Sequence, residues 1–559
     1  MAIDLKVIKD REDELAGLRG RMEGDEELVH LADYKLTGLG AKVIPNVVNV
    51  TLNKPAVFAT NVISSLGATK QQTTVESDDK KFDTHEVEQF LDAAFASANL
   101  RLMQKKQPLL NVFADVQNCL RGRSCRRVLF RLKDKKLVSD IASWDTHDVS
   151  YVTGEDGFAW ASNKTTRSKD EIIAEYKGLE GFKEGNVPEG KELVVREVWD
   201  TEVNGLYAGN SVFFEQENPY GFVPVVLEIV PLGYGGILLS KDRLRYEGES
   251  IFFMIRGLVP ELNRLVSILQ TKNLIQIKGP MQEEKKGGGE PADYDEVTAM
   301  GANTVVEPGE GFKFLNVADI SRSFDLFYPI LEKAFQEGSY TDIDIGNVRQ
   351  PFSAVALITI AEGKDQVFIP RLATRELLNK STAEMLIRQV LMLKESSVEL
   401  GVPGHKRKFQ TSILKGEFEI TYKSFTKSAK SEIARLSMAD AAANWYPRKY
   451  VYSDVLQVED SAGMMREWYN DQAELINPIV KTHRTIMNLY ELAEKGDEQA
   501  GQDASIMAHS LLQSLEVSQV PELEGKVEAS PREKLPLLGE GGKVGGIPVQ
   551  KQIAGVKHE

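Results

Sequence analysis

The stretch GESIFFMIRGLVPELNRLVSILQT at residues 248–271 places apolar side chains three or four positions apart. This spacing puts one continuous apolar stripe on one face of a helix. The stripe consists of Ile251, Ile255, Leu258, Leu262, Leu265 and Leu269. A second stretch, SRSFDLFYPILEKAFQEG at 321–338, repeats the pattern with Phe324, Phe327, Tyr328, Leu331 and Phe335. We expect two amphipathic helices, and Pro260 and Pro329 are positioned to kink them.

A small polar module separates the two predicted helices. Apolar strand candidates at 274–278 and 311–315 flank a polar centre, and the sequence KKGGG at 285–289 is typical of a flexible tip. A loop rich in turn-forming residues follows the second helix. A third helical pattern then runs from about Ala354 to about Glu395, and Pro370 inside it is expected to kink or break the helix.

The chain on either side of this region has a mixed pattern. Before it we expect a charged N-terminal arm, then helices at 57–66, 85–104, 109–120 and 169–176, and short strands at 128–132, 149–153, 158–162, 193–198, 205–207, 211–215 and 223–229. After it we expect a strand at 417–422 and helices from 431 to 515. Beyond Ser518 the sequence has no Phe, Trp or Tyr but several prolines and glycines, which predicts a disordered tail. The fold class is therefore α+β.

The amino-acid composition excludes several classes of function. The net charge of −15 over 559 residues argues against a protein whose main task is to hold nucleic acid tightly, because Lys and Arg dominate such binding. No run of about 18 apolar residues exists that would span a membrane, and the first residues lack the apolar core of a secretion signal. The two cysteines, Cys119 and Cys125, are interpreted as ordinary thiols.

Catalytic motifs are missing from the sequence. It contains no GxxxxGK[ST] phosphate loop, no HExxH and no GxSxG, and its seven histidines are scattered without ligand spacing. We therefore expect no enzyme activity, no cofactor and no metal. One alternative stays open, a soluble enzyme acting on a phosphorylated substrate through the Asp342/Asp344 pair.

The order of these segments resembles the portal (head-to-tail connector) protein of tailed bacteriophages. Local phrases also resemble the family: NPYGFVP at 218–224, the segment from Trp144 to Tyr151 followed by RSKDE at 167–171, and the run from Tyr452 to Ser461. The resemblance covers roughly residues 50–500. It implies an N-terminal arm (1–29), a wing (30–247), stem helices (248–271 and 321–340), a clip (272–320), a tunnel loop (341–353), a long helix returning to the wing (354–430), a helical crown (431–517) and a tail (518–559).

The resemblance also implies a function and partners. A portal subunit forms a homo-oligomeric ring, dodecameric in this family, at one capsid vertex of the virion, after assembly in the host cytoplasm. It contacts the major capsid and scaffolding proteins, docks the large terminase subunit during packaging and later joins neck or adaptor proteins. Double-stranded DNA passes through it without sequence preference, and ATP hydrolysis belongs to the separate motor.

The resemblance assigns candidate roles to three groups of residues. The tunnel loop would meet the DNA backbone through Asn347, Arg349 and Gln350. The clip tip would dock the terminase or neck proteins through Glu283, Glu284, Lys285 and Lys286. The stem would pack through Leu258, Leu262, Leu265, Phe327, Leu331 and Phe335.

A basic run occupies residues 121–136 and comprises Arg121, Arg123, Arg126, Arg127, Arg131, Lys133, Lys135 and Lys136. It is interpreted as a solvated strand face, or as a face that meets an acidic neighbouring subunit. Contact with DNA phosphates, as in a nucleic-acid-binding regulator, is the alternative.

Overall fold

The computed structural model describes most of the chain between residues 4 and 516. The described part leaves out residues 39, 80, 81, 134, 135, 180, 234–242, 278–280, 288, 289, 291, 292, 294–305, 307, 315–320, 340–353, 394, 427–435, 437, 457, 459 and 495–497. The chain divides into two compact units, Met1–Arg466 and Glu467–Glu559. Helices and strands both contribute to the fold, as an α+β protein requires. No helix in the described ranges is long and apolar enough to cross a membrane.

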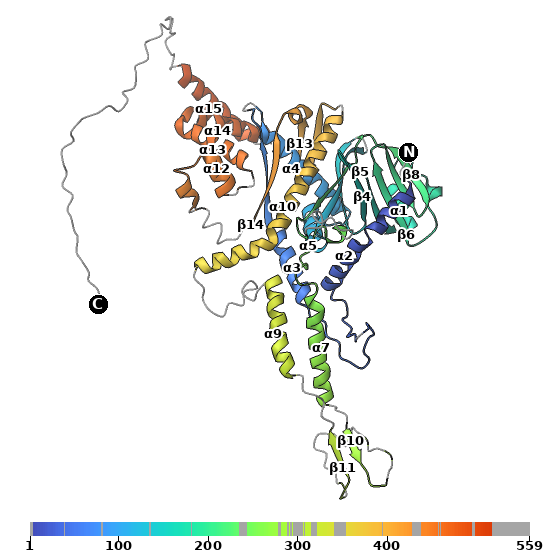
Figure 1. The fold of residues 1–559 in the computed structure, drawn as a ribbon. Helices are drawn as coiled ribbons and strands as arrows, with labels where there is room; N and C mark the ends of the chain where they lie inside the picture. Colours follow the sequence, from blue (N-terminus) through green and yellow to red (C-terminus); the bar gives the residue numbers. More distant parts are fainter. Residues whose placement is uncertain are drawn as a thin grey trace, which may run out of the picture. The chain divides into compact units, whose positions relative to one another are not determined.

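The largest sheet is an antiparallel meander of five strands in sequence order (Figure 1). It comprises β4 (Val149–Gly154), β5 (Gly157–Arg167), β6 (Leu193–Asp200), β7 (Val203–Ala208) and β8 (Ser211–Glu217). Each strand matches a predicted one, because short apolar runs bounded by Gly and Asn are a local signal. Helix α6 (Lys169–Tyr176) connects β5 to β6 and begins with a capping box formed by Ser168 and Glu171. The short helix η1 (Glu184–Asn186) also lies in this connection.

A three-stranded antiparallel sheet lies beside the main hydrophobic core. Its order is β3-β2-β9, with β2 (Arg123–Lys133) between β3 (Lys136–Trp144) and β9 (Val225–Ile229). Helices α4 (Thr84–Gln104), α5 (Leu110–Leu120) and α10 (Ala354–Met392) pack against these strands. The side chain of Gln389 on α10 accepts a hydrogen bond from Phe130 N at 2.6 Å and donates one to Val128 O at 2.7 Å. These bonds satisfy backbone groups of β2 beyond the end of its pairing with β9.

Two further strand pairs complete this core, one between distant parts of the chain and one in a local hairpin. Strand β1 (Thr69–Glu76) pairs antiparallel with β14 (Glu419–Thr426), and β12 (Ser397–Val402) pairs with β13 (His405–Gln410). Helix η3 (Thr411–Lys415) follows β13. Strand β14 was predicted at 417–422, whereas β1, β3, β12 and β13 were not. Strands β1 and β13 are mostly polar and lack the apolar alternation on which the prediction depended, whereas β12 has it at Val398, Leu400 and Val402 and was missed.

One of the three N-terminal helices meets the turn at Gly248 through a buried arginine. These helices are α1 (Leu5–Glu14), α2 (Ala16–Val29) and α3 (Lys54–Gly67). Arg21 on α2 donates hydrogen bonds to Gly248 O at 2.7 Å and to Arg121 O at 3.1 Å. Gly122 and Gly248 have φ angles of +74° and +72°, and a Cβ on Gly122 would lie 2.1 Å from Gly248 O. Only glycine fits this close approach. Helix η2 (Arg243–Tyr246) precedes the turn.

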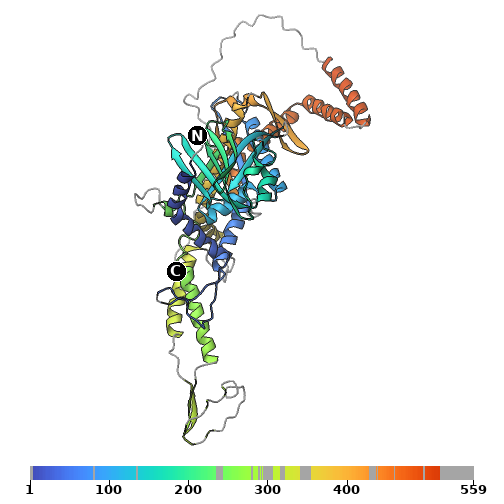
Figure 2. The same ribbon diagram turned by 90° about the vertical axis from the view of Figure 1, so that its right-hand side faces the viewer.

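The two helices expected from the apolar stripes form an adjacent pair (Figures 1 and 2). They are α7 (Leu258–Ile277) and α9 (Ser321–Gly338). The first differs from its prediction at both ends, because residues 251–257 form turns and the helix continues past Thr271. Pro260 therefore lies in the first turn of α7, where its missing N–H removes no intrahelical bond. Pro329 lies inside α9, which continues through it.

A short hairpin lies between α7 and α9 in the sequence. Strand β10 (Met281–Glu284) pairs antiparallel with β11 (Gly311–Phe314). The second strand was predicted, but the first was expected at 274–278, where residues up to Ile277 belong to α7. A short, mainly apolar run such as LIQIK at 274–278 does not distinguish a strand from a helix end.

Helix α10 runs through Pro370 as one continuous helix, and Figure 1 shows a bend in its axis. Proline lacks the N–H that would bond to the carbonyl four residues earlier, which gives the bend a physical cause. The predicted break is therefore not found, and a bent helix is what an internal proline allows. Thr374 Oγ1 donates a hydrogen bond to Pro370 O at 2.7 Å within the continuing helix.

The C-terminal part of the described chain is helical. It comprises α12 (Arg448–Tyr450), the π-helical turn η4 (Val451–Val455), α13 (Ser461–Ile476), α14 (Pro478–Glu494) and α15 (Glu498–Glu516). Helices α14 and α15 pack against each other. Helices were predicted over 431–515, and the predicted tail at 518–559 lies outside the described residues.

Candidate functional site

The facing sides of α7 and α9 and the turns before α7 are apolar. Leu262 is 1% exposed and Phe335 is 6% exposed, and both belong to one cluster with residues of α3. Leu258 and Leu331 are half-buried against the same cluster. Lys54 of α3 forms an ion pair with Glu332 and lies 5.5 Å from the Phe335 ring centroid. The N-terminal end of α7 and the C-terminal end of α9 thus pack against α3.

The outer side of α9 is also apolar but has no cover within the described chain. Leu326, Phe327 and Ile330 are 62%, 59% and 62% exposed. We call these three residues the α9 apolar row. Phe327 was expected to pack in the stem, and in the single chain it does not. The periodicity of the sequence predicted the helix but not the α9 apolar row. Residues 326 and 330 do not belong to the apolar stripe from which the helix was predicted.

Helix α7 carries a ladder of buried polar side chains. Asn263 and Ser267 are 5% and 0% exposed. Leu52 N donates to Asn263 Oδ1 at 3.0 Å, Val50 N donates to Ser267 Oγ at 2.9 Å, and Val48 N donates to Thr271 Oγ1 at 3.0 Å. Ladder residues four apart on the helix thus bind every second backbone N–H of an extended segment. Leu265 is half-buried on the same helix.

The expected docking residues lie at the end of the β10–β11 hairpin. Lys285 Nζ lies 3.2 Å from Glu283 Oε1, and Lys286 N donates to Glu310 Oε1 at 3.0 Å. Glu284, Lys285 and Lys286 are exposed. The tip therefore presents mixed charge, which suits a polar protein contact better than an apolar one. The docking role of these residues stays a prediction from the sequence.

The expected tunnel loop lies outside the described residues. This applies to Asn347, Arg349 and Gln350, and to the Asp342/Asp344 pair of the enzyme alternative. Their roles remain predictions from the sequence.

The basic run on β2 is neither a solvated face nor a DNA-binding face where its side chains are described. Arg121, Arg123 and Arg126 are 8%, 2% and 1% exposed. Arg121 bonds to Glu26 and Asp145, Arg123 pairs with Glu247, and Arg126 bonds to Asn379, Asn111 and Leu110 O. Burial of a cation is costly unless it is paired and hydrogen-bonded. These arginines therefore stabilise the interior of the fold. For them, the prediction of a solvated or subunit-contacting face and the alternative of DNA contact were both wrong.

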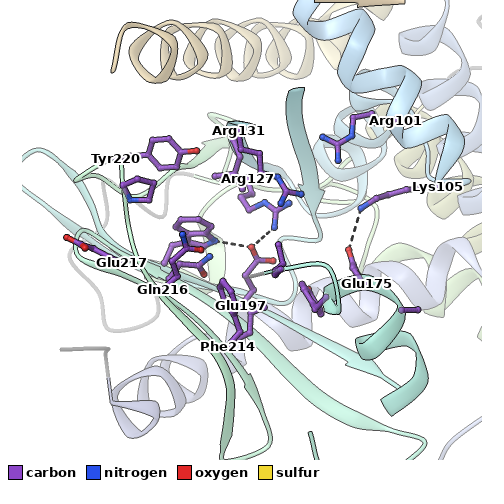
Figure 3. A pocket seen from close by; sticks show the side chains of 18 residues that line it. Arg101, Lys105, Arg127, Arg131, Glu175, Glu197, Phe214, Gln216, Glu217 and Tyr220 are labelled. Atoms are coloured by element: carbon purple, nitrogen blue, oxygen red, sulfur yellow. Dashed lines mark hydrogen bonds and ion pairs between the residues drawn. The ribbon is translucent and has the colours of Figure 1, made fainter. Parts of the chain in front are cut away.

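Arg127 and Arg131 of the same strand line a cavity of about 360 Å³ (Figure 3). Arg127 pairs with Glu197 and lies 3.6 Å from Asp140, while Arg131 also pairs with Asp140. Arg101 lies 3.3 Å from Asp140, and Figure 3 shows its side chain, with that of Lys105, at one side of the hollow. Lys105 Nζ lies 3.4 Å from Glu175 Oε1.

Charge in this cavity is balanced internally. Burial alone would raise the pKa of Asp140, but Arg127, Arg131 and Arg101 outweigh it and lower the pKa to about 2. Glu197 also accepts a hydrogen bond from the Trp199 indole at 2.9 Å. The described residues that line the cavity include no Ser, Cys or His. The arrangement is an ion-pair network that ties β2 and β3 to the five-stranded sheet.

Both cysteines are free thiols inside the protein. Cys119 and Cys125 are 0% and 1% exposed, and burial raises the pKa of Cys119 to about 12. A thiol in this state is a poor nucleophile. The interpretation of both cysteines as ordinary thiols agrees with their burial.

Comparison with solved structures gives a weak likeness. The sequence matches no protein-family model. No curated protein matches it. Among solved structures, it is similar to a chain from the neck of an empty GTA particle computed with C6 symmetry, with a TM-score of 0.35 and 12% identity over 71% of this chain and 88% of that chain. At this TM-score the likeness does not establish a shared fold.

Proposed function

We propose that this chain is the portal subunit of a tailed bacteriophage, a structural protein without enzyme activity. Copies of the chain form a ring at one capsid vertex, and DNA passes through the ring during packaging and ejection. The proposal takes α7 and α9 as the stem, the β10–β11 hairpin as the clip that docks the terminase and later the neck proteins, and residues 341–353 as the tunnel loop.

The observation that carries the proposal is the α9 apolar row. Leu326, Phe327 and Ile330 expose large apolar side chains within about one turn of helix. Exposed apolar patches of this kind mark interaction surfaces. A neighbouring copy of the chain is the proposed occupant, because a helix that packs on one side within its own subunit and is apolar on the other repeats naturally around a ring. Such a head-to-tail contact closes when its rotation fits.

Additional support comes from the way the pair is held. The base of α9 is fixed by Lys54 and the Phe335 cluster, and α7 is held by its polar ladder to residues 48–52. A channel wall needs helices whose direction is set by their own subunit before assembly. The net charge of −15 suits a conduit that attracts DNA only weakly, since each strong phosphate contact would add to the barrier for sliding.

The test is the native mass of the purified protein, measured by native mass spectrometry or light scattering and accompanied by negative-stain images. We expect closed rings of about a dozen subunits with a central hole. A monomer or dimer at every protein and salt concentration would overturn the proposal. In that case, Asp342→Ala combined with a phosphatase assay would test the enzyme alternative.

A further inference from the structure

Two side chains of α4 and one carboxylate from far along the chain meet at the start of that helix. His85 and Glu88 lie three positions apart and therefore on one face of α4. Asp460 directly precedes α13. His85 Nδ1 lies 3.6 Å from Glu88 Oε2 and 3.5 Å from Asp460 Oδ1. One donor atom from each of the three residues lies within 4.8 Å of the others.

The imidazole presents an unused nitrogen to this cluster. His85 is 8% exposed, and within the described chain its Nδ1 has no hydrogen-bond partner although it is buried. A buried polar atom without a partner carries a cost that a ligand would remove. His85 Nδ1 faces the carboxylates of Glu88 and Asp460.

The other ring nitrogen is held by Gln89. His85 Nε2 lies 2.7 Å from the Gln89 side-chain amide, and Gln89 Oε1 is itself buried without a partner in the described chain. Turning the amide over makes Oε1 the acceptor of Nε2–H, and the amide nitrogen then takes the position that has no partner in the described chain. The lone pair then lies on Nδ1, toward the carboxylates. Histidines that ligate metals are typically oriented by such a bond from their second nitrogen.

The carboxylates are held by bonds that fix their direction. Glu88 Oε1 accepts a hydrogen bond from Val75 N at 2.9 Å, which leaves Oε2 toward His85. Asp460 Oδ1 accepts from Gly463 N at 2.6 Å at the first turn of α13. The Glu88 residue is 8% exposed, whereas the Asp460 side chain is 54% exposed. The cluster thus has a buried floor and one side open to solvent, by which an ion can enter.

We propose that His85, Glu88 and Asp460 bind a divalent transition-metal ion of the zinc class, with water as a further ligand. Two donors bound at about 2.1 Å to a tetrahedral ion lie about 3.4 Å apart, close to the two separations at His85 Nδ1. One imidazole with two carboxylates suits zinc better than calcium or magnesium, which prefer oxygen ligands alone. The ion would join the first turns of α4 to the start of α13.

The test uses the full chain, purified without a polyhistidine tag and stripped with a chelator. Isothermal titration with zinc chloride should show one saturable site per chain, and cobalt substitution should give the visible spectrum of a tetrahedral complex. His85→Ala and Asp460→Asn should each abolish the saturable site and the cobalt spectrum. Gln89→Leu should weaken zinc binding at least about tenfold.

His147→Ala is the matched control. His147 also contacts two carboxylates, but Glu23 lies 3.1 Å from Nε2 and Asp148 lies 3.1 Å from Nδ1, on different ring nitrogens. This variant should bind zinc as the wild type does. A wild-type chain without a saturable zinc site, or a His85→Ala chain that binds zinc with unchanged affinity, would overturn the proposal. Ring formation is a separate measurement, so failure here leaves the portal proposal intact.

Discussion

Individual arginines of β2 show how strongly context determines the role of a charged residue. Arg126 is 1% exposed and bonds to Asn379, which is 253 positions away in the sequence. Arg127 and Arg131 share Asp140 as a partner. Carboxylates neutralise Arg127 and Arg131, and neutral oxygen acceptors bind Arg126, so these arginines contribute to the stability of the fold rather than to an electropositive surface.

Asp140 is the carboxylate on which this network depends most. Asp140→Asn leaves Arg101, Arg127 and Arg131 with one shared partner fewer, and we expect it to lower the free energy of unfolding by about 3–5 kcal/mol at neutral pH. Urea unfolding followed by circular dichroism measures this loss. Asp156→Asn, at an exposed carboxylate in the β4–β5 turn, is the control and should cost less than about 0.5 kcal/mol. Equal effects of the two substitutions would contradict the assignment.

The same residue predicts a pH dependence. The pKa of Asp140 is about 2 in the folded chain, below the value of about 3.9 for an unfolded one. The unfolded state therefore binds the proton first as the pH falls, so the contribution of Asp140 is complete above about pH 5 and is lost toward pH 2. The stability difference between wild type and Asp140→Asn should shrink over this range.

At the scale of elements, α7 and the segment before α3 hold each other. Residues 48, 50 and 52 donate their backbone N–H groups to side chains on α7, which gives this irregular segment the hydrogen bonds that a neighbouring strand would otherwise supply. Each step of four residues along α7, from Asn263 to Ser267 to Thr271, moves the contact back by two residues in the segment, from residue 52 to 50 to 48. The helix and the extended segment thus run antiparallel.

Ser267→Ala should release the middle of this contact. Its Oγ is the only acceptor recorded for Val50 N in the described chain, and Ser267 is fully buried, so the substitution should cost about 1–3 kcal/mol. Hydrogen exchange measured by mass spectrometry should show faster exchange in peptides covering residues 47–52. Gln270→Ala, on the exposed side of α7, should leave their exchange unchanged. If both variants exchange alike, the ladder does not hold the segment.

At the scale of the whole molecule, folding and assembly should respond to different residues. Leu262 is buried within the chain and Phe327 is exposed on it. Leu262→Asp places an unpaired charge in the core and should destabilise the chain by several kcal/mol. Phe327→Lys should leave the thermal midpoint of the isolated chain within a few degrees but prevent ring formation, as read by light scattering.

Phe327→Leu is the control for assembly, because it keeps the row apolar and should still form rings. Rings of normal size from Phe327→Lys would show that the α9 apolar row is not the subunit contact. Rings of normal size and stability from Leu262→Asp would contradict the packing of α7 described above.

Local pattern determined much of this protein by itself. Residues recurring at three and four positions located α4, α7, α9 and α10, and turn residues separated the strands of the five-stranded sheet, because both signals depend only on neighbours in the chain. The start of α7 was misplaced, since an apolar stripe continues through turns that pack in the same core. A polar strand such as β1 has no local signal in the sequence. It forms because it pairs with β14, which lies far along the chain and is brought beside it only by folding.

Burial of polar groups was decided only by the tertiary structure. Arg126 and Ser267 look like surface residues in the sequence, and they are buried because Asn379 and Val50 bring hydrogen bonds from remote segments. The cluster of His85, Glu88 and Asp460 has the same origin. Asp460 follows α10 and β14 in the sequence, and only the fold brings it to the start of α4. Hydrogen bonds and ion pairs act over a few ångströms in space, so the partners of a polar side chain are set by the fold and not by the local sequence.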